Sequence, residues 1–107
     1  PEWQQFIRDD KLALSDVTVS FLLTNRQLDR IARDAASEIR CPSLLMLAGR
    51  DRIIDNAAVL NWFDSLATQE RALVEYPGAS HTLEFEADRD LFVNDLLRWL
   101  VTVCQST

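Results

Sequence analysis

Two side chains able to exchange protons each follow a segment that reads as a strand. Asp51 lies two positions beyond Gly49, which closes the run SLLMLA, and His81, the only histidine, lies three positions beyond Gly78, which closes RALVEYPG. A carboxylate that accepts a hydrogen bond from one imidazole nitrogen fixes the tautomer of the ring. It also stabilises the cation that forms when the other nitrogen takes a proton. The two residues therefore indicate general acid–base chemistry, provided that the fold brings them together.

The elements expected to position these residues are a strand, a helix and a second strand. Residues 43–48 are continuously apolar, which is typical of a short strand buried on both faces, and residues 71–76 precede a Pro-Gly turn signal. Asp55 is a suitable N-cap for a helix between them. The apolar stripe of that helix is Val59, Leu60, Phe63, Leu66 and Ala67. Strands joined by a helix pair in parallel through a right-handed crossover, so the loops at their carboxyl ends lie roughly 5–10 Å apart.

Further helices are expected before and after this unit. Between residues 15 and 40 the apolar side chains recur at helical spacing: Val17, Phe21, Leu28, Ile31, Ala32 and Ala35. Thr24 and Gln27 have the spacing of a capping box, which predicts a second helix start near Asn25, and Pro42 ends that helix. Asp88 can cap a last helix. Its predicted buried face is Phe92, Val93, Leu96, Trp99, Leu100 and Val103.

The resulting order of helix, helix, strand, helix, strand, helix is an α/β architecture, and its sheet is incomplete. Two parallel strands with apolar faces and open edges do not make a self-sufficient sheet. We therefore expect the chain to pair with a further segment or with a second copy of itself. No repeat or charge block divides the 107 residues, so a single segment is predicted.

Composition excludes several classes of function. The net charge of −6 disfavours a nucleic-acid partner, because phosphates would be repelled. No apolar run is long enough for a transmembrane segment, and a soluble, cytoplasmic protein is expected. Cys41 and Cys104 are expected to be buried free thiols, and neither a cofactor nor a metal site is predicted.

The two strand–loop segments resemble a known family. CPSLLMLAGRDRIIDN and LVEYPGASHTLEFEADRDLFVNDLLRWL, together covering about residues 39–102, look like the C-terminal part of an α/β-hydrolase of the lysophospholipase and monoglyceride-lipase-like group. The resemblance implies that Asp51 is the triad acid and His81 the triad base of a serine ester hydrolase. Residues 1–38 resemble, more weakly, the helical exit from that family's cap region. The four residues Arg52, Ile53, Asp55 and Asn56, and the pair Trp99 and Leu100, match other family positions.

The nucleophile of that family is missing from this sequence. A G-x-S-x-G elbow needs two glycines four positions apart, whereas the only glycines here, Gly49 and Gly78, are 29 positions apart. The serine is therefore expected upstream of residue 1, since the family order is Ser, Asp, His. The chain alone is predicted to be inactive.

Each assignment has a simpler alternative. Asp51 could merely cap a backbone N–H, and His81 could be an exposed loop residue. Asp55 is the other candidate acid, although a helix N-cap is its expected role. Ser80 is expected to be a turn residue, and both Glu84 and Glu86 to be solvated. The aromatic residues are assigned to the core: Trp62, Phe63, Phe92 and Trp99.

Two functions remain open at this point. The first is an enzyme part that supplies Asp51 and His81 to a hydrolase of an ester or lipid, completed by the N-terminal half of the fold. The second is a non-catalytic interaction module that assembles through its exposed sheet edge and apolar faces.

Overall fold

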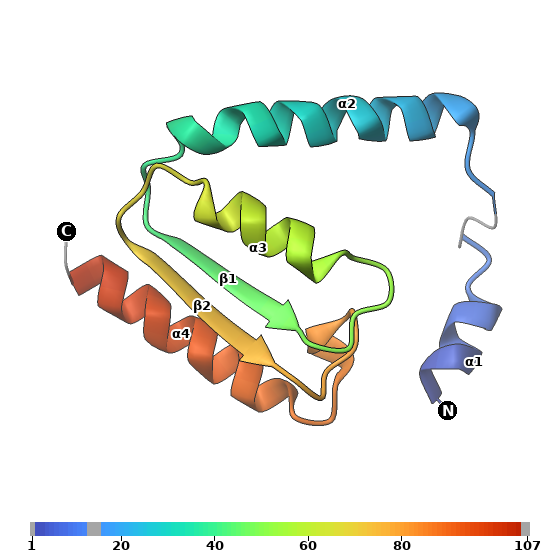
Figure 1. Cartoon of the computed structure of the whole chain (residues 1–107). Coiled ribbons are helices and arrows are strands. Elements are labelled where there is room, and N and C mark those ends of the chain that lie inside the picture. Colours follow the sequence, from blue (N-terminus) through green and yellow to red (C-terminus); the bar gives the residue numbers. More distant parts are fainter. Residues whose placement is uncertain (1, 13–15, 106–107) are drawn as a thin grey trace. The chain divides into compact units, whose positions relative to one another are not determined.

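The computed structural model describes residues 2–12 and 16–105 (Figure 1). The contacts of the chain divide it into two compact units, Pro1–Ala32 and Arg33–Thr107. The predicted element order holds from the first strand onward, whereas the helices before it have different bounds.

The first unit contains α1 (Glu2–Asp9) and most of α2 (Val19–Ala35). Instead of a second start near Asn25, α2 is one continuous helix. Its cap is Thr18, whose Oγ1 accepts from the Phe21 amide at 3.1 Å. Thr18 and Thr24 both precede helix-forming residues, and the first satisfies the helix end, so Thr24 lies in the helix interior.

The predicted apolar stripe of α2 is not buried within the described chain. None of the helix's described residues is buried. Its large apolar side chains are all more than half exposed: Val19, Phe21, Leu22, Leu23, Leu28 and Ile31. A helix with this much uncovered apolar surface normally packs against other protein.

The second unit is built on a parallel pair of strands. β1 (Ser43–Ala48) pairs with β2 (Arg71–Tyr76) over their whole length, from Ser43 opposite Arg71 to Ala48 opposite Tyr76. Both strands have the predicted bounds. Because they run in parallel, their carboxyl ends, and the loops with Asp51 and His81, emerge at the same edge (Figure 1).

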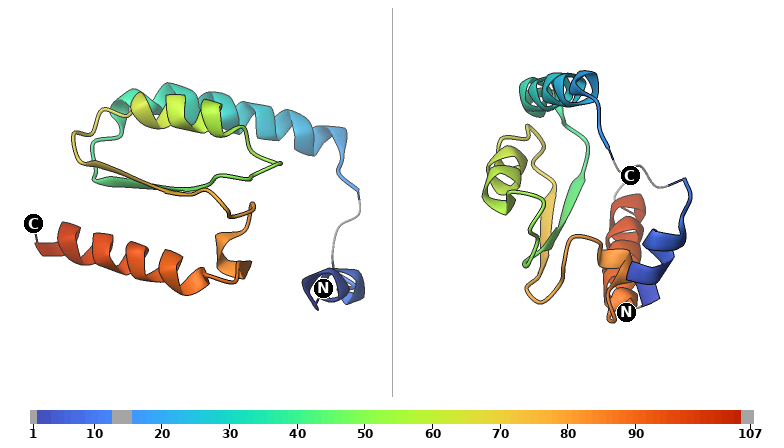
Figure 2. Two further views of the ribbon diagram at one scale, coloured as in Figure 1. Left: turned by 60° about the horizontal axis from the view of Figure 1, so that its bottom comes forward. Right: turned by 90° about the vertical axis from the view of Figure 1, so that its right-hand side faces the viewer.

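Helix α3 (Asn56–Asp64) is the crossover between the strands and covers one face of the sheet (Figure 2). Asp55 is its N-cap as predicted, with the side chain accepting from the Ala58 amide at 3.1 Å. The small core contains Ala36 of η1 (Ala36–Glu38) and, from the α3 region, Phe63 and Leu66. Ile39, Leu45 and Trp62 pack against it.

Helix α4 (Arg89–Gln105) lies on the opposite side of the two strands from α3, so this unit has three layers (Figure 2). Tyr76 links β2 to α4: its hydroxyl donates to Asp95 Oδ2 at 2.9 Å, and its ring meets Phe92 edge-on at 6.4 Å between centroids. Burial, and then the hydrogen bond to Asp95, raise the pKa of Tyr76 to about 12. The Tyr76 hydroxyl therefore keeps the proton that it donates to Asp95.

The buried face predicted for α4 is narrower in the structure. Its half-buried stripe is Phe92, Leu96, Trp99 and Val103, whereas Val93 and Leu100 are 43% and 42% exposed. Val93 and Leu100 lie beside this stripe on the helix surface. A wider surface than the two strands provide would be needed to bury them as well.

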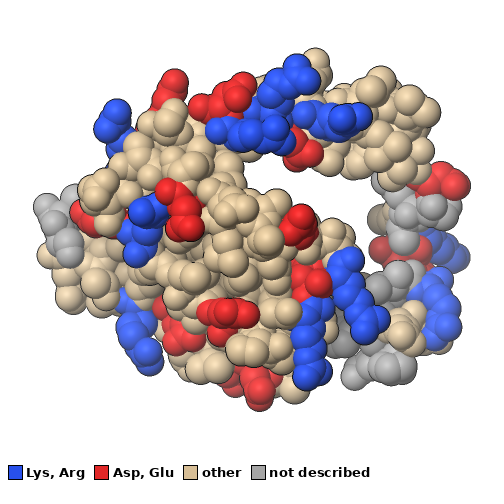
Figure 3. Space-filling view, viewed as in Figure 1, with Lys and Arg blue, Asp and Glu red and all other residues tan. Residues whose placement is uncertain are grey.

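The sheet is incomplete, as predicted. Among the described residues it contains two strands, so each strand has one edge without a neighbour. Charged side chains of both signs are interspersed over the face seen in Figure 3, with broad uncharged areas between them.

Cys41 and Cys104 are free thiols but both are exposed, so the prediction of buried thiols is wrong. Cys41 precedes β1, and Cys104 lies in the last turn of α4, where this chain provides little cover. No helix in the described segments has the length and apolar character needed to cross a membrane.

Candidate active site

The loop after β1 turns sharply and presents Asp51. The Gly49 amide continues the strand ladder by donating to the Tyr76 carbonyl at 2.9 Å, and the Asp51 amide closes a turn onto the Ala48 carbonyl at 3.2 Å. Asn56 supports the same turn, because its Nδ2 donates to that Ala48 carbonyl at 2.8 Å. The carboxylate is therefore carried on a short, hydrogen-bonded segment at the carboxyl end of the strand.

The two oxygens of Asp51 have different partners. Oδ1 accepts from the amides of Ile53 and Ile54 at 2.8 and 3.0 Å, and Oδ2 contacts His81 Nδ1 at 2.8 Å. The side chain is 7% exposed. The pKa of Asp51 falls from its ordinary 3.8 to about 2, chiefly through the hydrogen bond with His81 and next through that from Ile54, while burial opposes the shift. The carboxylate is thus ionised at neutral pH and can only accept hydrogen bonds.

The loop after β2 carries His81 and is joined to the Asp51 loop. The Ala79 amide closes the Pro77–Gly78 turn onto the Tyr76 carbonyl at 3.0 Å, and the Ala79 carbonyl accepts from the Arg50 amide at 2.9 Å. Gly49 lies against Pro77 so closely that a Cβ there would be 2.7 Å from the Pro77 Cα. Backbone contacts therefore hold the two loops together next to the side-chain pair.

The position of Asp51 determines which tautomer of His81 the site favours. Since an ionised carboxylate accepts, Nδ1 of His81 must donate to it, and Nε2 of the neutral ring is then an acceptor. The ring is 40% exposed, in contrast to its partner. An acceptor nitrogen on a partly exposed ring, backed by a fixed carboxylate, can take a proton from a group placed beside it.

Other residues singled out in the sequence have structural positions. Asp55 caps α3 and is not hydrogen-bonded to His81 in the structure, so the structure brings Asp51, and not Asp55, to the imidazole. Ser80 lies in the His81 loop, where its amide donates to a carboxylate. Within residues 2–12 and 16–105 no group of three or more His, Cys, Asp and Glu side chains is arranged to hold a metal.

Two contributors to the site were not identified from the sequence. The carboxylate of Glu86 accepts from the Ser80 amide at 2.6 Å, immediately before His81, so the prediction that Glu86 is solvated is wrong. Asn56, noted only as a matching position, braces the Asp51 turn, and its buried Oδ1 has no hydrogen-bond partner in the described structure. The sequence does not single out Glu86, which lies five positions after His81, because Glu84 is an acidic residue in the same loop.

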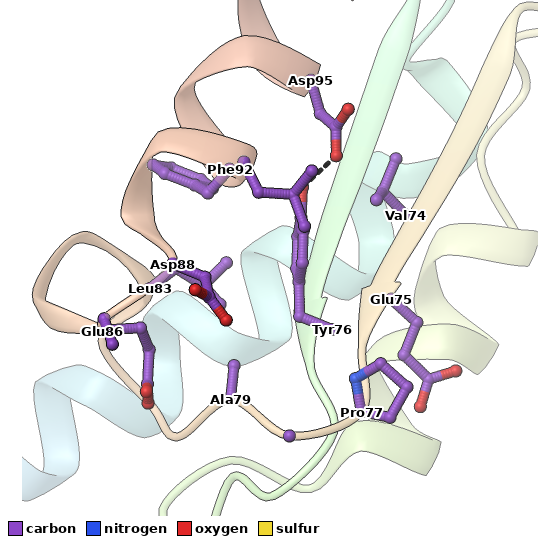
Figure 4. A pocket seen from close by; sticks show the side chains of 13 residues that line it. Val74, Glu75, Tyr76, Pro77, Ala79, Leu83, Glu86, Asp88, Phe92 and Asp95 are labelled. Carbon is purple, nitrogen blue, oxygen red and sulfur yellow. Dashed lines mark hydrogen bonds between the residues drawn. The ribbon is translucent and has the colours of Figure 1, made fainter.

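A cavity of about 390 Å³ lies behind the His81 loop. It is lined by the end of β2, the 77–79 turn, η2 (Leu83–Phe85) and the first turns of α4, and it is open on one side (Figure 4). Tyr76, Phe92 and Leu91 give it apolar walls, and Glu86 and Asp88 bring carboxylates to it. Neither Asp51 nor His81 lines it, so it is separate from the acid–imidazole pair.

Three comparisons relate the chain to known hydrolases. A family model described as serine aminopeptidase, S33, matches residues 1–88. Phospholipase YtpA of Bacillus subtilis (strain 168) is 33% identical over 52 residues, which are 49% of this chain and 20% of that protein. The crystal structure of a monoacylglycerol lipase from Paleococcus ferrophilus superimposes with a TM-score of 0.84 at 20% identity, over 96% of this chain and 40% of the lipase chain. The matches thus span a fifth of the phospholipase and two fifths of the lipase, and the chain has part of the lipase's fold.

Proposed function

Since this chain belongs to the serine aminopeptidase S33 family, we propose that it is the C-terminal segment of a serine ester hydrolase, to which it supplies the catalytic acid Asp51 and the catalytic base His81. The observation that carries the proposal is the 2.8 Å contact between Asp51 Oδ2 and His81 Nδ1. It joins the only histidine of the chain to a carboxylate that is nearly inaccessible to solvent.

In the proposed reaction His81 moves the proton and Asp51 does not. The Nε2 lone pair takes the proton of a serine hydroxyl as that oxygen attacks the ester carbonyl, and later returns it to the leaving alcohol. Asp51 keeps Nδ1 protonated and stabilises the imidazolium formed in between. The two amide hydrogen bonds to Oδ1 hold the carboxylate still while the charge on the ring changes.

The nucleophile of this reaction has to come from outside the chain. The spacing of Gly49 and Gly78 excludes a G-x-S-x-G elbow here, and the family order places the serine before the acid. Removing the nucleophile from a comparable triad lowers the rate by about 10⁶-fold. The 107 residues alone are therefore expected to have no measurable hydrolase activity.

The proposed substrate is an ester of a fatty acid, as in a lysophospholipid or a monoacylglycerol. The names of the two relatives, a phospholipase and a monoacylglycerol lipase, support this class. We assign residues 1–38 to the exit from the cap of such an enzyme and residues 39–107 to its last strand–helix–strand–helix portion. The remaining part of the fold, with the nucleophile, is the proposed partner.

Substitutions in a protein that joins this segment to its nucleophile half test the proposal. His81→Ala should remove esterase activity by several orders of magnitude, and Asp51→Asn should lower kcat by about 10⁴-fold. Asp55→Asn is the matched control, because that carboxylate caps α3, and its kcat should stay within about threefold of the wild type. Near-normal turnover by His81→Ala would contradict the proposal.

A fluorophosphonate probe separates the joined protein from the chain alone. The joined protein should be labelled at its serine, whereas the 107-residue chain should remain unlabelled. Labelling of the isolated chain would show an activated serine within these residues and would contradict the assignment of the nucleophile to the other part.

The unpaired edge of β1 favours a second candidate function, a non-catalytic interaction module. Within the described chain β1 pairs only with β2, and an open strand edge can add a strand from another polypeptide. A module of this kind would pair through β1 without any need for His81. The His81→Ala variant would then bind its partner polypeptide as well as the wild type does. In the first function the same variant loses esterase activity, so the two measurements distinguish the candidates.

A further inference from the structure

Glu86 makes a short, charge-assisted hydrogen bond to the residue that precedes His81. Its Oε1 accepts from the Ser80 amide at 2.6 Å. The side chain is half-buried, and it extends along the cavity behind the loop towards the segment that follows Ala79 (Figure 4). Hydrogen bonds from a backbone N–H to an ionised carboxylate are among the stronger ones in proteins.

This bond acts on the His81 loop from the side opposite the Asp51 loop. On one side the Arg50 amide holds the Ala79 carbonyl at 2.9 Å. On the other side the 77–79 turn and Glu86 both line the cavity, and Glu86, directly after η2, accepts from the Ser80 amide. A peptide held from both sides has little freedom to carry the next residue away from its partner.

We propose that Glu86 is a positioning residue, whose carboxylate holds the Ser80 peptide so that the His81 ring stays within hydrogen-bonding distance of Asp51. This deepens the proposed function and rests on it for its catalytic meaning. Glu86 itself touches neither His81 nor Asp51 through a hydrogen bond, so its effect passes through the backbone of the loop.

The neutral His81 ring provides a readout that does not need catalysis. His81 is the only histidine, so its two ring nitrogens give unambiguous ¹⁵N signals in the 107-residue chain. Their chemical shifts measure the ratio of the Nδ1–H form, which Asp51 stabilises, to the Nε2–H form. A loop that drifts from Asp51 loses part of that preference.

Four variants test the proposal. In Glu86→Ala the ratio should fall roughly tenfold, which is the effect of losing one charge-assisted hydrogen bond. Glu86→Gln keeps an acceptor oxygen at the same reach and should stay within about threefold of the wild type. Glu86→Asp keeps the charge but is one methylene too short, so it should behave like the alanine variant. Glu84→Ala, an exposed neighbour in η2, should leave the ratio unchanged.

The amide spectrum of β1 and β2 separates a loop effect from general unfolding. If Glu86→Ala does not fold, the Gln and Asp variants decide: a normal ratio in Gln with a reduced ratio in Asp supports the proposal. A wild-type ratio in Ala, or in both Gln and Asp, would overturn it. A failed His81→Ala activity test would remove the proposed function and would leave this ratio, and hence the positioning role, separately measurable.

Discussion

At the scale of single residues, the two oxygens of Asp51 are held for different purposes. Oδ1 is occupied by two backbone amides, which leaves Oδ2 to meet His81. The positions of Asp51 and His81 could be predicted because both follow the end of a strand in a parallel pair. The part played by Glu86 could not, since its bond to a backbone amide six residues earlier depends on the path of the loop, and Glu84 has the same local surroundings in sequence.

The lowered pKa of Asp51 predicts a distinct stability profile in acid. Because its folded-state pKa is about 2 and its ordinary value is 3.8, its contribution to stability is fully present above about pH 4 and is lost as the pH falls towards 2. Asp51→Asn has no carboxyl group at this position, so its free energy of unfolding should decrease less than that of the wild type as the pH falls from about 4 to about 2. Urea unfolding at a series of pH values from 5 to about 2 measures the difference.

The control for this prediction is Asp90→Asn. The Asp90 side chain is 95% exposed, so its removal should leave the acid profile as steep as in the wild type. Parallel profiles for the wild type and Asp51→Asn would show that the hydrogen bond with His81 does not stabilise the folded chain.

At the scale of elements, the site depends on two loops that approach one another at the ends of β1 and β2. Both strands were predicted with their observed bounds. β1 is a continuous apolar run that Gly49 closes, and β2 ends at the Pro-Gly turn signal that follows Tyr76. The second helix start predicted near Asn25 is wrong, because Thr18 and Thr24 are both acceptable caps and the structure uses Thr18. The close contact between the loops after β1 and β2, where Gly49 lies against Pro77, could not be predicted from the sequence either.

Gly49 is predicted to be required for this approach. In Gly49→Ala the new Cβ would lie 2.7 Å from the Pro77 backbone, so one loop must move, at a cost of about 1–3 kcal/mol in the free energy of unfolding. The same movement should weaken the contact between Asp51 and His81. Denaturant unfolding and the histidine ¹⁵N shifts measure the two effects.

Gly78→Ala provides the matched control. A Cβ at Gly78 would meet nothing within 4 Å, and neither glycine has a positive φ, so backbone strain is not involved. We expect this variant to differ from the wild type by less than about 1 kcal/mol. Equal stability of the two alanine variants would mean that the loops adjust without cost.

At the scale of the whole molecule, the chain is a partial fold with uncovered apolar surface. Its relatives are two and a half to five times longer than the parts that match, judged by coverage of 40% and 20%. The unpaired edge of β1, and exposed apolar residues of α4 such as Leu97 and Val101, are surfaces that further protein would cover. The incomplete sheet was predictable from the count of strands, whereas its missing neighbours lie outside the sequence.

This surface predicts that the isolated chain associates. Sedimentation at micromolar concentration should give a dimer or a larger species, because open strand edges and apolar faces pair when nothing else covers them. Leu97→Lys places a charge on the exposed side of α4 and should shift the chain towards monomer without unfolding it. A wild-type chain that is monomeric at these concentrations would contradict the prediction.

The most direct test of the central claim is the tautomer of the neutral His81 ring, with Asp51→Asn as the comparison. In that variant the amide oxygen must take the Oδ1 position to accept from Ile53 and Ile54, so the NH₂ group faces Nδ1 and donates to it. We predict that ¹⁵N spectra will show the proton on Nδ1 in the wild type and on Nε2 in Asp51→Asn. A proton on Nε2 in the wild type, or the same tautomer in both proteins, would contradict the assignment of Asp51 and His81 as an acid–base pair.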